Sequence, residues 1–162
     1  MSRMNDVSFS EQEKEELAKK ICGKLSEGEI GKVLVFGSSN ITYLTCGVVF
    51  PYMDQKIVHP VALYMCLETG RRILICTFDL CDIPKQMNWE GEVLIYALTE
   101  RTPELSLAAA LGSHIEGQIG IDESYTTNAQ LKALEEYSPD SNFINVDETI
   151  DKLKLQKTDA EI

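Results

Sequence analysis

The sequence contains two neighbouring apolar runs, residues 61–67 (VALYMCL) and residues 72–77 (RILICT), separated by only four residues. Both runs are short and strand-like, with several β-branched residues. The separating segment contains Gly70, which can adopt the positive φ that a tight turn requires. The pattern therefore predicts a β-hairpin, and an isolated hairpin needs further strands or a helix to be stable.

Further strand and helix patterns alternate on both sides of the hairpin. Short apolar runs predict strands at residues 32–36, 93–98, 119–122 and 143–146, and amphipathic or capped segments predict helices at residues 10–26, 102–112, 127–137 and 148–154. Residues 32–36 (KVLVF) are apolar on both faces, which is typical of a central strand. This alternation predicts an α/β fold in which helices cover a mixed sheet. We see no linker, so residues 1–162 are expected to form a single domain.

Several local signals mark helix ends and loops. Ser10 is expected to cap the first long helix with Glu13, and Asp147 is expected to cap the last. Residues 37–40 (GSSN) are expected to form a turn, and residues 41–45 have too mixed a composition for an assignment. The segment between Phe50 and Pro60 has two prolines and no clear period, so it is expected to be a loop.

Charge and cysteine content restrict the partners and the compartment. The chain has 15 Lys and Arg residues against 26 Asp and Glu residues, a net charge of −11, which disfavours binding to nucleic acid or to an anionic membrane. No apolar stretch is long enough for a signal peptide or a membrane span, so the chain is expected to be cytoplasmic. The five cysteines are expected to be reduced, and Cys76 and Cys81 could form half of a zinc site only if other ligands joined them.

Catalytic and metal-binding motifs are incomplete. His114-Ile115-Glu116 matches the H-x-E half of a zinc deaminase signature, but the P-C-x-x-C half is absent. The Gly37 segment lacks the lysine of a phosphate-binding loop, and no G-x-S-x-G elbow is present. The sequence therefore predicts no catalytic residues, no metal ligands and no cofactor within this chain.

Three segments carry a resemblance to the N-terminal domain of the creatinase and prolidase family. The first resembles the family pattern N-I-x-Y-L-T-G and consists of Asn40, Ile41, Thr42, Tyr43, Leu44 and Thr45. Cys46 stands where the pattern has glycine. Residues 119–123 (IGIDE) resemble the family's IGxE strand, and residues 147–162 resemble the segment that leads into a catalytic domain. The resemblance implies a mixed sheet of about six strands with helices on both faces, in a layout similar to ribonuclease H.

The resemblance also implies a function. Family members such as Xaa-Pro dipeptidases, Xaa-Pro aminopeptidases and creatinase carry out their chemistry in a C-terminal domain, which holds a divalent metal pair (Mn, Co or Zn) in the peptidases. This chain is thus expected to be a noncatalytic N-terminal domain and to be inactive alone. Residues 1–9 are expected to be flexible, and residues 155–162 to form the junction to the absent catalytic domain. The implied partners are a second copy in a homodimer, the catalytic domain, and short Xaa-Pro peptides in the parent.

Two questions stay open at this stage. The chain could instead be a stand-alone or pseudo-peptidase module that binds proteins, and the resemblance does not separate the dipeptidase, aminopeptidase and creatinase-like subtypes. In the resembling enzymes the loop after the motif approaches the neighbouring active site. Phe50, Tyr52 and His59 are accordingly candidates for shaping the substrate entrance. The alternative is that Phe50 is a core residue and the other two are ordinary loop residues.

Overall fold

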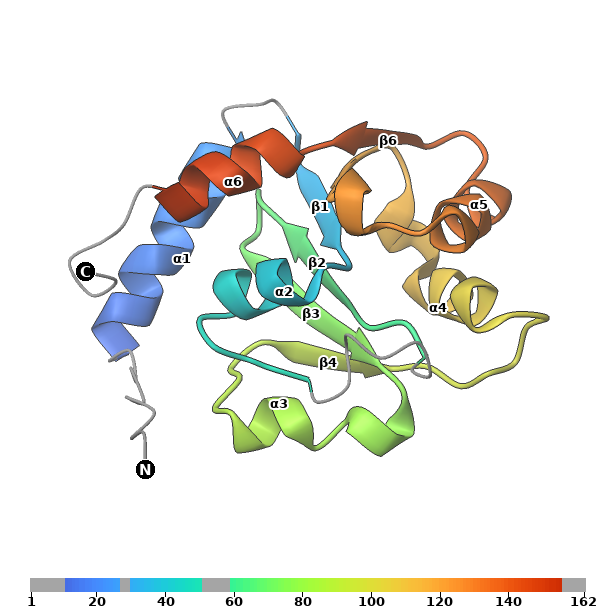
Figure 1. Ribbon diagram of the computed structural model, residues 1–162, viewed down its shortest axis with the longest axis horizontal. Helices are drawn as coiled ribbons and strands as arrows, with labels where there is room; N and C mark the ends of the chain where they lie inside the picture. The colour runs from blue at the N-terminus through green and yellow to red at the C-terminus, as the bar shows by residue number, and fades with distance from the viewer. Residues whose placement is uncertain (1–10, 27–29, 51–58, 156–162) are drawn as a thin grey trace.

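The computed structural model describes residues 11–26, 30–50 and 59–155 of the 162-residue chain, in which helices and strands alternate (Figure 1). The helices are α1 (Glu11–Ser26), α2 (Ser38–Leu44), α3 (Ile83–Gln86), α4 (Pro103–Leu111), α5 (Asn128–Tyr137) and α6 (Asp147–Leu155). The strands are β1 (Lys32–Val35), β2 (Ala62–Cys66), β3 (Arg71–Cys76), β4 (Glu92–Ile95), β5 (Gln118–Ile121) and β6 (Asn142–Asn145). Short 3₁₀ turns are η1 (Phe78–Leu80), η2 (Gly112–Ile115) and η3 (Glu123–Tyr125). No helix among the described residues is long and apolar enough to cross a membrane.

The six strands form one mixed sheet in the order β4-β3-β2-β1-β5-β6. Strand β2 is antiparallel to β1 and β3, whereas the pairs β1–β5, β5–β6 and β3–β4 are parallel. Val33 of β1 lies opposite Met65 of β2 on one side and Gly120 of β5 on the other. The predicted mixed sheet is confirmed, and residues 32–36 supply a central strand as expected.

The predicted hairpin is formed by β2 and β3. Gly70 in its turn has a φ of +71°, a left-handed conformation that glycine adopts without a steric penalty. Its N–H donates to the carbonyl oxygen of Cys66 at 2.9 Å, which closes the turn. The hairpin predicted from the glycine between two apolar runs is therefore confirmed.

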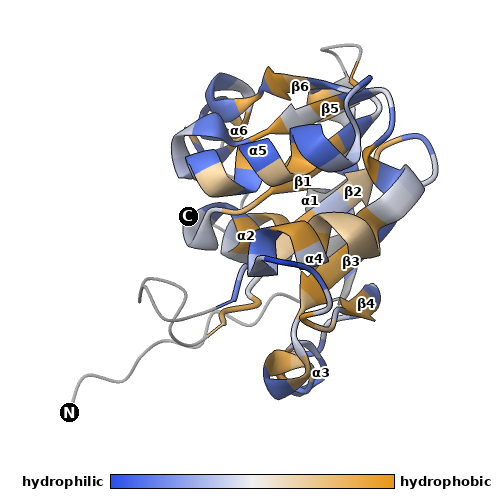
Figure 2. Cartoon of the chain, turned by 90° about the vertical axis from the view of Figure 1, so that its right-hand side faces the viewer, coloured by the Kyte–Doolittle hydropathy of each residue, from blue (hydrophilic) through white to orange (hydrophobic). Residues whose placement is uncertain are grey.

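Two hydrophobic cores lie on opposite faces of the sheet. Val33 and Val35 of β1 point into the first core, and Leu34 points into the second, as the alternation of side chains along a strand requires. The first core is covered by α1, α2 and α6, and the second by α4 and α5 (Figure 1). In Figure 2, β1 and β3 are coloured largely as hydrophobic. Helices on both faces are thus confirmed.

The turn predicted at residues 37–40 is wrong, because helix α2 begins at Ser38. Gly37 is its N-cap residue, with an extended backbone (φ −66°, ψ 130°) and no side-chain hydrogen bond to the helix. The start of this helix therefore has none of the local capping that a sequence pattern reveals. Its support comes from a residue far along the chain, described below.

Other boundaries also differ from expectation. Strand β4 ends at Ile95, three residues before the predicted end, and α3 and η1 lie where no helix was predicted. Pro84 lies in the first turn of α3, where proline is tolerated. Helix α6 begins at Asp147, one residue earlier than predicted. The predicted Ser10 cap, residues 1–9 and residues 156–162 lie outside the described residues.

Candidate functional site

The carboxyl ends of β1 and β5 form the topological switch point of the sheet. These two strands are parallel neighbours, but the chain leaves β1 toward α2 and β2 and leaves β5 toward α5 and β6, on opposite sides. In α/β sheets, ligands bind in the crevice outside the strand ends where connections diverge in this way. A binding site in this fold is therefore expected first at this position.

Asp122 occupies the switch point. It directly follows β5 and is completely buried. Its Oδ1 accepts a hydrogen bond from the N–H of Phe36 at 2.9 Å, and its Oδ2 accepts from the N–H of Gly37 at 2.7 Å and from Nδ2 of Asn40 at 3.0 Å. The carboxylate of Asp122 thus satisfies two backbone N–H groups that follow β1 and the side-chain amide of Asn40.

The environment of Asp122 acts on its ionisation in two directions. Burial raises the pKa of the Asp122 carboxyl above its ordinary value, because removal from water disfavours the charged form. The hydrogen bonds from Phe36, Asn40 and Gly37 lower the pKa, and burial has the larger effect. A buried carboxylate with three donors is a structural anchor that is closed to solvent.

Gly37 is required by close packing at this point. A Cβ atom on Gly37 would lie 2.7 Å from the ring of Tyr125 and 2.9 Å from Oδ2 of Asp122, which is closer than real Cβ contacts. The glycine therefore lets the backbone approach the carboxylate and the ring. This accounts for the glycine after β1 without a phosphate-binding role.

Helix α6 is attached to the same cluster through α2. Nζ of Lys154 donates hydrogen bonds to Oδ1 of Asn40 and, at 3.4 Å, to Oγ of Ser39. The hydroxyl of Tyr43 donates to the carbonyl oxygen of Leu153 at 3.0 Å. Asn40 therefore links two segments, because its amide nitrogen binds Asp122 and its amide oxygen accepts from Lys154. We call Asp122, the N–H groups of Phe36 and Gly37, Asn40 and Lys154 the Asp122 junction.

Asp147 adds a connection between the start of α6 and η3. The sequence predicted that Asp147 would cap the last helix, but the residue lies within its first turn. Its Oδ2 accepts hydrogen bonds from the N–H of Ser124 at 2.9 Å and from Oγ of Ser124 at 2.7 Å. The carboxylate thus ties α6 to the segment that follows β5.

The remaining motif residues pack or terminate α2. Ile41 and Leu44 are buried in the first core. Oγ1 of Thr45 donates to the carbonyl oxygen of Ile41 at 2.6 Å and accepts from the N–H of Val48 at 3.0 Å. Cys46 has a φ of +60°, a conformation that glycine adopts more readily. The glycine of the family pattern is therefore explained by backbone conformation at this position.

The three entrance candidates lie in different settings. Phe50 is only 2% exposed and packs in the first core, in agreement with the core alternative. His59 is half-buried and precedes Pro60, whose carbonyl oxygen accepts a hydrogen bond from the hydroxyl of Tyr96 at 2.5 Å. Tyr52 lies outside the described residues. Of the three, only His59 is seen partly at the surface.

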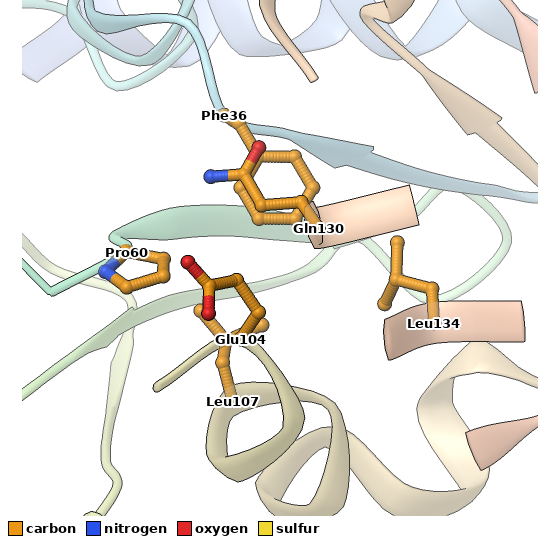
Figure 3. A pocket seen from close by; sticks show the side chains of 6 residues that line it. All are labelled: Phe36, Pro60, Glu104, Leu107, Gln130 and Leu134. Carbon is orange, nitrogen blue, oxygen red and sulfur yellow. The ribbon is translucent and has the colours of Figure 1, made fainter. Parts of the chain in front are cut away.

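A shallow hollow lies near the switch point, between α4 and α5 (Figure 3). The lining side chains leave essentially no space even for a water molecule, whereas pockets that hold drug-sized ligands measure roughly 300–1,000 Å³. The residues lining it are Phe36, Pro60, Glu104, Leu107, Gln130 and Leu134. This hollow is too small to be the principal binding site of a peptide.

No metal-binding cluster is present in the described parts of the chain. Within those residues, no group of three or more His, Cys, Asp or Glu side chains could hold an ion. Cys76 is buried, and burial raises the pKa of its thiol to about 12, which keeps it protonated. Cys81 is partly buried against the same core.

The sequence motifs include Asn40 and the IGIDE strand, but they do not predict the hydrogen bond between Asn40 and Asp122. They also do not identify Gly37 and Lys154 as members of one cluster. The available signal was an aspartate immediately after an apolar strand, because a carboxylate at a strand end is well placed to accept hydrogen bonds from a neighbouring strand end.

Comparisons with known proteins place this geometry in a family. The sequence matches the creatinase/prolidase N-terminal domain over residues 18–155. A comparison with curated protein sequences finds no match. Among solved structures, an Xaa-Pro dipeptidase from Bacillus anthracis superposes with a TM-score of 0.68 at 17% identity, covering 91% of this chain and 38% of that one. The chain thus spans well under half of that enzyme.

Shorter solved chains match over nearly their whole length. A proline dipeptidase structure from Streptococcus pneumoniae has a TM-score of 0.68 at 16% identity, covering 86% of this chain and 98% of that one. An Xaa-Pro aminopeptidase structure from Streptococcus thermophilus has a TM-score of 0.63 at 17% identity, with coverages of 87% and 98%. These likenesses establish a shared fold. With the sequence match over residues 18–155, they show that the chain belongs to the creatinase/prolidase N-terminal domain family.

Proposed function

We propose that this chain is the noncatalytic N-terminal domain of an Xaa-Pro dipeptidase- or aminopeptidase-like hydrolase, in which it supports dimerisation and shapes the entrance to the active site. Family membership and the structural likeness to domains from both enzyme types support the proposal. The observation that carries it is the Asp122 junction. The position where this sheet would bind a ligand is filled by the chain's own carboxylate.

The junction gives the domain the properties of a scaffold. It joins the end of β1, the start of α2, the end of β5 and the last turn of α6 through hydrogen bonds between residues more than 80 positions apart. Because buried polar groups that are all satisfied rigidify a structure, these elements are held in one arrangement. A rigid domain can present its loops to an active site on another domain.

Among the described residues, the proposed entrance role rests on His59, which is half-buried. The carbonyl oxygen of Pro60, the next residue, accepts a hydrogen bond from the hydroxyl of Tyr96, so the chain is anchored directly beside His59. Together with Tyr52, His59 could contact a short Xaa-Pro peptide in the parent enzyme. In this proposal the parent's C-terminal domain holds the divalent metal pair (Mn, Co or Zn), and this chain supplies none of its ligands.

A protein-binding module without catalysis is the second candidate. The apolar side chains of Val93 and Ile95 on the outermost strand favour it, because they are 38% and 46% exposed. The remainder of the open reading frame separates the two candidates. A downstream domain with five metal ligands supports the hydrolase parent, and a downstream domain without them supports the binding module.

The direct test compares the isolated chain with the full-length parent. We expect the isolated chain to cleave no Xaa-Pro peptide and to show no tight binding of Mn²⁺, Co²⁺ or Zn²⁺ by calorimetry, because a metal pair needs several fixed ligands.

In the parent, Tyr52→Ala and His59→Ala are expected to change kcat/KM without changing thermal stability. Tyr137→Ala, at an exposed position on α5, is the matched control. Unchanged kinetics in both loop variants would eliminate the entrance role.

A further inference from the structure

Cys66 lies at the end of β2, in the middle of a row of residues that runs across the sheet. Strand β2 lies between β1 and β3 and is antiparallel to both (Figure 1). The register sets Lys32 of β1 opposite Cys66 on one side and Arg71 of β3 opposite it on the other. Directly opposite residues share a face, with Cβ atoms about 4.5–5.5 Å apart. The thiol of Cys66 is therefore flanked by two cationic side chains.

The row lies at the margin of the second core. Cys66 packs against this core and is only partly buried. Two residues earlier on β2, the ring centroid of Tyr64 lies 5.0 Å from that of His114 in η2. Burial lowers the pKa of His114, and the positive charges of Arg71 and Lys32 lower it further. Basic side chains from β1, β3 and η2 thus converge at this end of the sheet.

The hairpin turn adds hydrogen-bond donors to the sulfur of Cys66. A hydrogen bond from the Thr69 side chain has the largest effect and lowers the pKa of the Cys66 thiol, and backbone hydrogen bonds from Thr69 and Glu68 lower it further. Partial burial and the carboxylate of Glu68 raise the pKa, but the pKa of Cys66 is lowered overall. These surroundings favour the thiolate, which is the nucleophilic form of cysteine.

Two other cysteines lie in different surroundings. Cys76 is completely buried, and burial raises the pKa of its thiol to about 12. Cys81 is partly buried against the first core and directly precedes Asp82. Reactive cysteines are typically partly exposed and lie next to lysine, arginine or charged histidine. Cys66 matches this description, because it lies between a lysine and an arginine.

We propose that Cys66 is a modification site, at which the thiol exchanges with small disulfides that carry carboxylate groups. Lys32 and Arg71 provide the recognition, because carboxylates of the approaching disulfide can pair with a cation on each side of the sulfur. The ion pair with Glu92 offsets part of the charge of Arg71, but it also holds the guanidinium in place through Nε and Nη2. The proposal does not depend on the function proposed above.

The exchange is a nucleophilic displacement at sulfur. The Cys66 thiol loses its proton to solvent, and the thiolate attacks one sulfur of the small disulfide. A bond forms between Sγ of Cys66 and that sulfur, and the original sulfur–sulfur bond breaks. Its electron pair leaves on the second sulfur as a thiolate, which takes up a proton from water. Cys66 is thereby oxidised by the small disulfide, whose released half is reduced, and a free thiol reverses the reaction.

Peptide mass spectrometry of the unmodified chain tests the proposal with two reagents. Oxidised glutathione carries carboxylates, and bis(2-hydroxyethyl) disulfide is uncharged. The ratio of the two modification rates is compared between Cys66 and Cys81, because this ratio cancels differences in thiol reactivity. The net charge of −11 acts on both sites. We expect the ratio of the glutathione rate to the uncharged-reagent rate to be about fivefold higher, or more, at Cys66.

Substitutions of Lys32 test the recognition. Lys32→Gln should lower the rate ratio at Cys66 by about threefold or more, and Lys32→Arg should retain it, because the positive charge is kept. Lys132→Gln is the matched control, since it removes the same charge from an exposed position on α5. Equal urea unfolding curves show that the variants are folded. The comparison of the two reagents on the unmodified chain requires no variant.

Each outcome bears on the proposal. A preference of Cys66 for oxidised glutathione that is lost in Lys32→Gln and kept in Lys132→Gln supports it. A rate ratio at Cys66 no higher than that at Cys81 overturns it, and so does a ratio that Lys32→Gln leaves unchanged. Slower reaction of Cys66 than of Cys81 with both reagents overturns it as well. The role as a domain of a hydrolase is tested separately, by the cleavage assay on the parent.

Discussion

Asp122 and Glu92 show how differently one chemical group is used at two places in the same sheet. Asp122 is fully buried at the switch point, and Glu92 lies at the β4 edge with its side chain 51% exposed. Burial raises the pKa of Asp122, whereas the hydrogen bond from Arg71 lowers the pKa of Glu92. The first carboxylate is therefore an anchor inside the domain, and the second is a surface ion pair.

The two regions differ in how far their groups are satisfied by contacts within the chain. At the Asp122 junction each buried donor meets an acceptor from the same chain, and no buried side-chain nitrogen or oxygen atom among the described residues lacks a partner. At the β4 edge, by contrast, the aliphatic side chains of Val93 and Ile95 are 38% and 46% exposed. Substitutions at the junction should accordingly destabilise the fold, and substitutions at the edge should have little effect on its stability.

The largest effect is expected from Asp122→Ala. This change leaves the N–H groups of Phe36 and Gly37 and the amide of Asn40 without an acceptor. Each buried unsatisfied group costs about 1–3 kcal/mol, so we expect a loss of about 3 kcal/mol or more in the free energy of unfolding by urea. Glu123→Ala, at the exposed neighbouring position, should change stability by less than about 0.5 kcal/mol. Equal losses in the two variants would refute the anchoring role.

Gly37→Ala should have the next largest effect. The new methyl group would clash with Tyr125 and Asp122, and overpacking of this kind costs about 1–3 kcal/mol. Gly23→Ala is the opposite control, because Gly23 lies in α1 with no atom within 4 Å of an added Cβ. There alanine should stabilise the helix by roughly 0.5–1 kcal/mol. Thermal unfolding of both variants separates steric exclusion at Gly37 from a general effect of adding a methyl group.

Asn40→Ala should cost about 1–2 kcal/mol, because it removes one of three donors to Asp122 and the acceptor of Lys154. Asn142→Ala gives the comparison at an exposed asparagine on β6. Urea unfolding that is indistinguishable in the two variants would show that the family motif does not stabilise the domain through Asn40.

The two carboxylates should give opposite pH dependences. Since the pKa of Asp122 is raised on folding, the part of its stabilising contribution that is linked to its ionisation is full below the ordinary aspartate pKa and is lost as the pH rises through the folded value. Since the pKa of Glu92 is lowered, its contribution is present above the ordinary glutamate pKa and is lost as the pH falls through the folded value. The free energy of unfolding of the wild type minus that of Asp122→Asn should thus decrease with rising pH. The free energy of unfolding of the wild type minus that of Glu92→Gln should increase with rising pH. Slopes of the same sign would contradict the comparison.

Local signals predicted much of the fold. The hairpin turn at Gly70 and the helices predicted at residues 102–112 and 127–137 are confirmed. The starts of these two helices are also local features, because the Thr102 side chain caps α4 and a capping box at Thr127 begins α5. The start of α2 was missed because its support comes from Asp122, 85 residues from Gly37. The motif around Asn40 was recognised as a pattern, but its physical role depends on contacts that only the folded chain creates.

The smallest stability effect is expected at the edge. Ile95→Thr should change the free energy of unfolding by less than about 0.5 kcal/mol, because the side chain is already 46% exposed. Ile75→Thr on the neighbouring strand is the buried control, since Ile75 has no exposed surface, and it should destabilise far more. Urea unfolding at low protein concentration makes this comparison. A large loss for Ile95→Thr would mean that the edge is covered within the monomer.

Native-state hydrogen exchange at the amides of Phe36 and Gly37 tests the central claim most directly. Both residues lie beyond the end of β1, and the acceptor of each N–H is the carboxylate of Asp122. The anchoring role predicts that both amides exchange as slowly as the core amides of β1, which open only with global unfolding. Fast exchange of these two amides, alongside a protected Leu34, would contradict the Asp122 junction.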